Sequence, residues 1–173
     1  LNRVVQSPDF YVKIKSMKDK RKVINKISDA LNANDLDSAR KLIENDLKRV
    51  GSREEYYFYQ ALITKDLNKK LELYTLALDL NNKYLDAWIN RGLVNNELGN
   101  YEASLKDYDK AVELDSKCAL AFNNRGYTKF KQQNYEGALA DYNKAILLNP
   151  KFQMALDNKA LLFQTVCMKD DKD

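Results

Sequence analysis

Hydrophobic residues recur three and four positions apart along most of the chain, which is the spacing of helices that bury one face. Two segments show it most clearly. One carries Leu105, Tyr108 and Val112 with Ala111 beside them, and the other carries Leu139, Tyr142 and Ile146 with Ala138 and Ala145 alongside. This spacing predicts helices rather than strands.

The two stripes belong to a longer repeat with an offset of 34 positions, as from Trp88 to Phe122. Matching residues at this offset are Arg91/Arg125, Gly92/Gly126, Tyr101/Tyr135, Leu105/Leu139, Asp107/Asp141, Tyr108/Tyr142, Lys110/Lys144, Ala111/Ala145 and Leu114/Leu148. A third copy begins after Pro150 with Leu156, Asn158, Lys159 and Ala160. So many matches at one offset indicate an internal structural repeat.

Each repeat is predicted to contain two helices. The expected breaks within repeats are Gly99-Asn100 and Gln133-Asn134, and those between repeats are Asp115-Ser116 and Asn149-Pro150. Weaker copies lie upstream. Residues 54–81 keep a second-helix stripe of Leu71, Tyr74, Ala77 and Leu78, preceded by Tyr57 and Ala61 with a turn that we expect to be about three residues shorter. Val23, Ile27 and Leu31, then Ala39, Ile43, Leu47 and Val50, fit a degenerate unit that turns at Asn34-Asp35.

These residues resemble the tetratricopeptide repeat family. The family pattern is met by Trp88, Gly92, Tyr101, Tyr108 and Ala111, and again by Phe122, Gly126, Tyr135, Ala138, Tyr142, Ala145 and Pro150. Two positions depart from it: Arg91 and Arg125 replace an apolar residue, and Asn95 and Lys129 replace an aromatic one. The resemblance implies an all-α, right-handed superhelical solenoid of antiparallel helix pairs with a C-terminal capping helix.

We therefore expect seven segments. They are an N-terminal extension (1–16), a degenerate helix-turn-helix repeat (17–53), a divergent repeat (54–84), two tetratricopeptide repeats (85–118 and 119–152), a C-terminal capping helix (153–168) and a disordered tail (169–173). In the first segment, Ser7-Pro8-Asp9 is typical of a helix start, with Ser7 as the cap and Pro8 at the first helical position.

Composition supports a folded helical protein, with 45% hydrophobic and 31% charged residues and only five glycines and two prolines. Cys118 and Cys167 are far apart and are expected to be free thiols, which favours a cytoplasmic location. No apolar run reaches the roughly 18 residues of a membrane-spanning helix. The sequence begins with Leu1 rather than Met, so a removed targeting segment remains open.

The sequence contains no histidine, so it lacks the usual neutral-pH acid and base, Ser-His and Cys-His pairs and imidazole zinc ligands. Its five glycines are scattered and form no phosphate-binding loop. We predict that the protein is not an enzyme and has no catalytic residues, metal site or cofactor.

The main charge cluster lies near the N-terminus and consists of Lys13, Lys15, Lys18, Lys20, Arg21, Lys22 and Lys26. It is interpreted first as the solvated side of an amphipathic helix. The alternative is contact with nucleic acid or an anionic membrane surface. The net charge of +4 is modest, and no aromatic residues interleave with the basic ones as a base-stacking surface requires, so nucleic acid is disfavoured.

The resemblance implies a concave groove, lined by the first helix of each repeat, that holds a peptide or helix of a partner protein. Because the family glycine packs helix against helix, the face that carries Asn90 is left for the groove. The predicted groove residues are Asn90, Leu93, Glu97, Asn123, Asn124, Tyr127, Lys131, Asn158 and Leu161.

Two ladders run through this set, one of asparagines (90, 124 and 158) and one of apolar residues (93, 127 and 161). Asparagine amides can hold an extended peptide backbone, since each offers donors and an acceptor. The competing interpretation is that they bond only with neighbouring groups of the protein. One branch of the family clamps the terminal carboxylate of chaperone tails with lysines; here the flanking positions are Ile89, Leu93, Met154 and Asn158, so no such clamp is expected.

Three hypotheses follow: a non-catalytic interaction scaffold, a nucleic-acid or membrane-surface protein acting through the basic segment, and a self-assembly module whose groove holds another copy's terminal helix. Within the repeats, Gly92 and Gly126 are expected to let the second helix approach near Tyr108 and Tyr142. Arg91 and Arg125 are expected to pair with Asp107 and Asp141.

Overall fold

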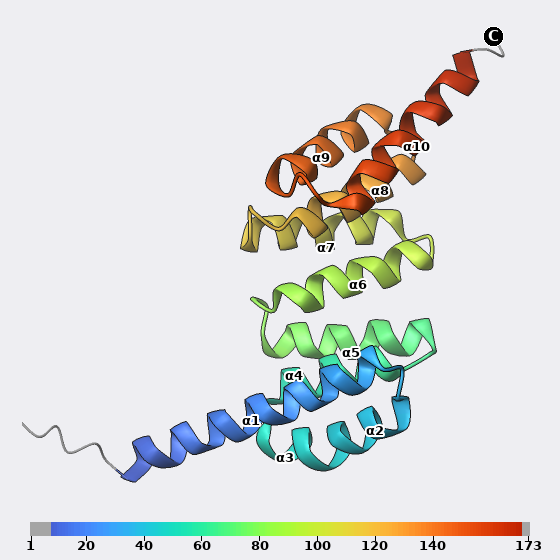
Figure 1. The fold of residues 1–173 in the computed structure, drawn as a ribbon. Coiled ribbons are helices and arrows are strands. Elements are labelled where there is room, and N and C mark those ends of the chain that lie inside the picture. Colours follow the sequence, from blue (N-terminus) through green and yellow to red (C-terminus); the bar gives the residue numbers. More distant parts are fainter. Residues whose placement is uncertain (1–7, 171–173) are drawn as a thin grey trace, which may run out of the picture. The chain divides into compact units, whose positions relative to one another are not determined.

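Helices are the regular elements of residues 8–170, the part of the chain that the computed structural model describes (Figure 1). The predicted all-α fold class is confirmed. The chain divides into two units, residues 1–81 and 82–173. Residues 1–7, which include the predicted Ser7 cap, and 171–173, part of the predicted tail, lie outside the described residues.

The first unit begins with one long helix. Its elements are α1 (Pro8–Asn32), α2 (Leu36–Lys41), the π-helix η1 (Leu42–Leu47), α3 (Lys48–Val50), α4 (Arg53–Ile63) and α5 (Leu67–Leu80). Because α1 starts at Pro8 and runs without a break past residue 16, the expected extension is continuous with the first repeat from residue 8 onward. The predicted turn at Asn34-Asp35 is confirmed: Asn34 has a φ of 56°, and the Asp35 carboxylate caps α2 by accepting from the Ser38 N–H at 3.0 Å.

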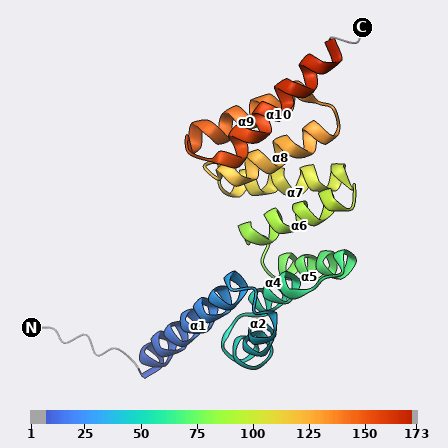
Figure 2. The same ribbon diagram turned by 45° about the vertical axis from the view of Figure 1, so that its right-hand side comes forward.

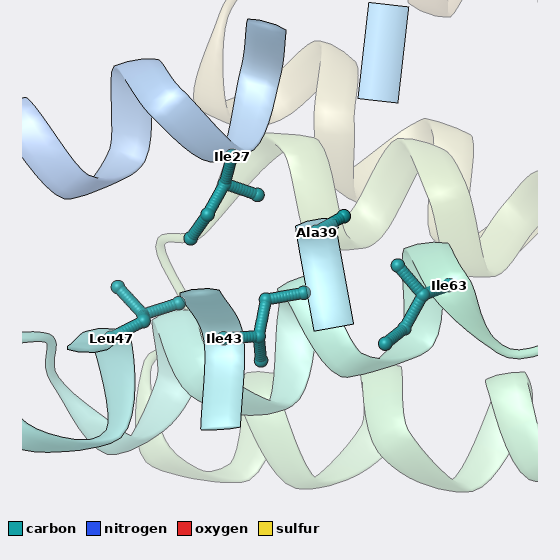
Figure 3. Packing of buried hydrophobic residues seen from close by; sticks show 5 residues of the cluster. All are labelled: Ile27, Ala39, Ile43, Leu47 and Ile63. Carbon is teal, nitrogen blue, oxygen red and sulfur yellow. The ribbon is translucent and has the colours of Figure 1, made fainter. Parts of the chain in front are cut away.

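A small apolar core holds the beginning of this unit together. Ile27 of α1, Ala39 of α2, Ile43 and Leu47 of η1, and Ile63 of α4 converge on one another (Figure 3). All but Ile63 are fully buried. Ile43 and Leu47 are four residues apart, so one face of η1 supplies both side chains to the core.

The next repeat follows the same 34-residue register as the later ones. α4 ends at Ile63 and α5 begins at Leu67, which are 34 positions before Glu97 and Tyr101. The prediction of a shorter turn was wrong. The 34-residue register is hard to recognise here because Phe58 occupies the position that glycine has in the later repeats, at Gly92 and Gly126. The Phe58 ring packs against that of Tyr74, with centroids 5.7 Å apart.

The second unit repeats one helix pair and adds a final helix. Its elements are α6 (Leu85–Glu97), α7 (Tyr101–Leu114), α8 (Ala119–Lys131), α9 (Tyr135–Leu148) and α10 (Gln153–Asp170). The breaks predicted within the pairs are confirmed: Gly99 and Gln133 occupy equivalent places with φ of 78° and 62°, in the left-handed conformation that ends a helix. Buried tyrosine and alanine side chains of α7 and α9, namely Tyr108, Ala111, Tyr142 and Ala145, form the centre of each repeat.

The final helix lies against the second repeat. α8, α9 and α10 are neighbours (Figures 1 and 2), and α10 buries Ala155 and Leu162 against α9 and the end of α8. It covers α9 as predicted, and it continues two residues beyond the predicted end at residue 168. Cys118 is half-buried and Cys167 exposed, and both are free thiols.

Candidate functional site

A groove in the second unit follows its first helices. A hollow of about 550 Å³ is lined by Leu93, Asn96, Glu97, Leu98, Gly99, Tyr101, Tyr108, Asn124, Tyr127 and Lys131. A smaller hollow of about 230 Å³ is lined by Leu93, Asn123, Asn124, Tyr127, Met154 and Asn158. Because Leu93, Asn124 and Tyr127 line both hollows, the two adjoin and form one groove across α6, α8 and α10. We call it the concave groove.

Close packing behind the concave groove fixes its walls. A Cβ added to Gly92 would lie 2.9 Å from Cε1 of Tyr108, and one added to Gly126 would lie 2.9 Å from Cε1 of Tyr142. These distances are below normal contact, so only glycine allows the two helices of each repeat to approach this closely. The predicted role of both glycines is confirmed.

Each helix pair is also joined by a buried ion pair. Arg91 Nη2 lies 2.6 Å from Asp107 Oδ1, and Arg125 Nη2 lies 2.6 Å from Asp141 Oδ1. The two aspartate side chains are only 3% and 5% exposed. Both predicted pairings are confirmed. The hydrogen bond with Asp141 is the main cause of a raised Arg125 pKa, so that guanidinium stays charged.

The residues that depart from the family pattern contact the same aspartate within each repeat. Asn95 Nδ2 donates to Asp107 Oδ2 at 2.9 Å, and Lys129 Nζ lies 2.7 Å from Asp141 Oδ2. Each buried aspartate is therefore held by an Arg and by the residue one helical turn later. This second partner was not predicted, although the i, i+4 spacing from Arg91 to Asn95 was a usable signal.

Most of the predicted groove residues line the concave groove. Leu93, Glu97, Asn124, Tyr127 and Lys131 border the larger hollow, while Asn123 and Asn158 border the smaller one. Two do not line either hollow. Asn90 donates to the Asp86 carbonyl of its own helix at 2.7 Å, and Leu161 is 45% exposed on α10. What these residues bind stays a prediction.

The asparagines of the concave groove are bonded to one another. Asn158 Nδ2 donates to Asn123 Oδ1 at 2.9 Å, and Asn123 Nδ2 donates to Asn124 Oδ1 at 3.1 Å. The Asn124 backbone carbonyl also accepts from the Thr128 hydroxyl at 3.1 Å. An amide nitrogen carries two hydrogens, so Asn123 and Asn158 each keep a second N–H beyond these bonds. The three ladder asparagines, Asn90, Asn124 and Asn158, thus all bond within the protein, as the competing interpretation expects, and a bond to a ligand stays a prediction.

Several lining residues were not predicted. Leu98 and Gly99 come from the turn between α6 and α7, which was predicted only as a break, and Asn96 and Tyr101 come from the helix ends on either side of it. Tyr108 of α7 also lines the larger hollow. Burial raises the pKa of its hydroxyl strongly and outweighs the polar side chains of Ser104 and Asn124, which lower it. Tyr108 therefore remains a neutral phenol at physiological pH.

The basic N-terminal segment lies on α1. Lys18, Arg21, Lys22 and Lys26 are exposed, whereas Lys20 Nζ pairs with Glu55 of α4 at 3.1 Å. The side chains of Lys13 and Lys15 lie outside those that the structure describes. At least one member of the cluster thus holds α1 against α4.

Neither a metal centre nor a membrane-spanning helix is found among the described residues. Among them, no group of three His, Cys, Asp or Glu side chains could hold a metal ion. None of the helices in residues 8–170 combines the length and hydrophobicity needed to cross a membrane.

Comparison with known proteins finds similarity to one family within the second unit. The tetratricopeptide repeat family model matches residues 85–118 and 119–152. Among solved structures, the Arabidopsis OM64 TPR domain is 27% identical, with a TM-score of 0.61 over 63% of this chain and 93% of that one. Pseudomonas aeruginosa pilF is 16% identical, with a TM-score of 0.78 over 89% and 72%.

A third similar structure contains a ligand. The first TPR of Spaghetti (RPAP3), solved bound to the HSP90 peptide SRMEEVD, is 23% identical, with a TM-score of 0.57 over 66% of this chain and 87% of that one. No curated protein sequence matches the chain significantly.

Proposed function

We propose that this chain, whose residues 85–118 and 119–152 are tetratricopeptide repeats, is a non-catalytic scaffold that binds a peptide or helical segment of a partner protein in its concave groove. Proteins of this family are generally non-catalytic scaffolds. The observation that carries the proposal is the concave groove itself, which runs past three successive first helices and is therefore suited to an elongated ligand.

Exposed apolar side chains in the concave groove are the expected anchors. Leu93 is 44% exposed, Tyr127 37% and Met154 51%, and all three border the smaller hollow. Binding energy in interfaces is concentrated in a few such side chains, with tyrosine among the most frequent. The second N–H of Asn158, which is half-buried, would bond to a backbone carbonyl of the ligand, whereas Asn123 is buried.

The similarity to a peptide-bound structure supports a peptide ligand but not the same peptide. A carboxylate clamp needs cations at positions where this chain has Ile89, Leu93, Met154 and Asn158. Ile89 is buried, and the other three give the smaller hollow an apolar and amide lining. Glu97 and Lys131 both border the larger hollow, so its charge is mixed. We therefore infer a ligand anchored by apolar side chains rather than by a terminal carboxylate.

The test is selection of peptides from a random display library on the full chain, followed by affinity measurement with single variants. Tyr127→Ala and Leu93→Ala should each lower the affinity of the chain for the selected peptides about tenfold. Leu120→Ala, which removes another exposed leucine on α8 outside the concave groove, is the matched control and should leave affinity unchanged. Asn124→Ala is a poorer probe, because the Asn124 side chain also accepts a hydrogen bond from Asn123.

Equal affinity of Tyr127→Ala and Leu120→Ala for every selected peptide would contradict the proposal. Light scattering at several concentrations distinguishes self-assembly: a dimer lost in Tyr127→Ala would mean that another copy occupies the concave groove.

A further inference from the structure

α10 carries a second apolar surface that no helix of residues 8–170 covers. Leu156, Ala160 and Phe163 lie at i, i+4 and i+7 and therefore on one face. Leu156 is 38% exposed, Phe163 is 48% exposed, and Ala160 is exposed as well. We call these three residues the α10 face. It is separate from the concave groove, to which α10 contributes Met154 and Asn158.

The equivalent face is covered in both preceding repeats. Thirty-four positions earlier stand Phe122, Gly126 and Lys129 of α8, and 34 before those stand Trp88, Gly92 and Asn95 of α6. Tyr142 of α9 lies against Gly126, and Tyr108 of α7 lies against Gly92. The chain's own repeats thus show that this face accommodates the second helix of a pair.

Lys159 indicates the charge that a helix covering the α10 face should carry. It occupies the place of Arg91 and Arg125, each of which pairs at 2.6 Å with an aspartate of its covering helix. Lys159 Nζ lies 5.9 Å from the centre of the Phe163 ring, four residues later, whereas Arg91 and Arg125 lie over the rings three residues before them, Trp88 and Phe122. Within the described residues Lys159 makes no ion pair, so an acidic group on the covering helix would complete the arrangement.

We propose that the α10 face is a docking site for an amphipathic helix of a partner protein, distinct from the ligand of the concave groove. The helix would run antiparallel to α10 and carry the stripe Leu-x-Asp-Φ-x-x-Ala, in which Φ is a large apolar residue. This stripe is common to α7 and α9, as Leu105, Asp107, Tyr108 and Ala111 and as Leu139, Asp141, Tyr142 and Ala145. Its aspartate would pair with Lys159.

Ala160 refines the residue expected at Φ. A Cβ at Gly92 or Gly126 would lie 2.9 Å from the facing tyrosine ring, and Ala160 has that Cβ. The partner helix therefore carries a smaller or more flexible side chain than tyrosine there, such as leucine. A second copy fits less well, because its α7 and α9 are already packed and pairing two α10 faces would bring two Lys159 side chains together without an acid.

The experiment titrates a fluorescent peptide of residues 134–150 with the change Tyr142→Leu onto the full chain. Phe163→Glu should weaken binding about tenfold, because a charge replaces an apolar anchor. Leu147→Glu, at a 74% exposed residue of α9 outside both surfaces, is the control and should bind as the unaltered chain does. Lys159→Glu should also weaken binding, and the additional peptide change Asp141→Lys should restore it. Circular dichroism checks that each variant is folded.

Three results would overturn the proposal. They are no binding of the peptide to the unaltered chain, equal affinity of Phe163→Glu and Leu147→Glu, and no restoration by the charge exchange. If the peptide fails to bind while light scattering shows a dimer that Phe163→Glu dissociates, the occupant is a second copy. Tyr127→Ala should leave binding of this peptide unchanged, so this proposal and that for the concave groove can fail separately.

Discussion

Asp107 of α7 is held by Arg91 of α6 in a bidentate ion pair, and only 3% of its side chain is exposed. A buried carboxylate is stable when charged partners and hydrogen bonds replace the water that it has lost. Arg91 and Asn95 both provide these bonds from one face of α6. The two helices of the repeat are therefore joined by polar contacts as well as by the Gly92–Tyr108 contact.

Removing this carboxylate should destabilise the second unit. We expect Asp107→Ala to lower the free energy of unfolding by about 3 kcal/mol, because it leaves Arg91 without its buried partner. The measurement is urea unfolding followed by fluorescence of Trp88, the single tryptophan, which lies in this unit. Asp109→Ala is the control: its 63% exposed carboxylate pairs with Arg125 and should contribute less than about 1 kcal/mol. Equal losses would show that burial of Asp107 is not the cause.

Gly92→Ala should also destabilise the second unit. Alanine gains about 1 kcal/mol in helix propensity, but its Cβ overpacks the buried Tyr108 ring, which costs roughly 1–3 kcal/mol. We therefore expect a net loss near 1 kcal/mol in the same unfolding experiment.

A double-mutant cycle checks the cause of that loss. In a Tyr108→Leu background the ring is absent, so Gly92→Ala should become neutral or stabilising. If the cost of Gly92→Ala is the same in both backgrounds, contact with Tyr108 does not explain it.

Glu55 should make the first unit sensitive to acid. Burial acts to raise the pKa of its carboxyl, but hydrogen bonds from Ser52 and Lys20 outweigh burial and leave the pKa below its ordinary value. A lowered folded-state pKa stabilises the fold above the unfolded pKa, and this contribution is lost as the pH falls through the folded value.

Glu55→Gln should therefore reduce protection of α4 amides from hydrogen exchange at pH 7, by about 1 kcal/mol as for the loss of a helix cap. The difference from the unaltered chain should shrink as the pH falls below the ordinary carboxyl pKa of 4.5. Glu54→Gln, in the same helical turn and without a cap bond, serves as the control. A difference that stays constant with pH would contradict the assignment.

The basic segment of α1 should not by itself bind nucleic acid. With Lys20 paired to Glu55 and no aromatic side chains among the basic ones, we expect no binding to single-stranded RNA or anionic vesicles at physiological salt. Fluorescence anisotropy and vesicle sedimentation at several salt concentrations measure this. Binding that persists at physiological salt and falls steeply as salt rises would instead favour the surface-binding hypothesis.

Much of the second unit could be predicted because its information is local and repeated. The 34-residue offset and the tyrosine and alanine stripe predicted the helix pairs. The recurrence of both residues as Arg125 and Asp141 predicted the Arg91–Asp107 pair. The first unit was harder because Phe58 replaces the glycine that marks the register. A cytoplasmic location remains a prediction from composition alone.

The sequence by itself determined which faces of the helices are apolar, because periodicity follows from helix geometry. It also placed Leu93 and Tyr127 on the face that lines the concave groove. Beyond the two Arg–Asp pairs, only the tertiary structure decided which polar groups bond across helices. It brought Asn158 to Asn123, gave each buried aspartate its second partner, and left the α10 face uncovered. Such contacts depend on distances between helices, and residue spacing along one helix does not contain them.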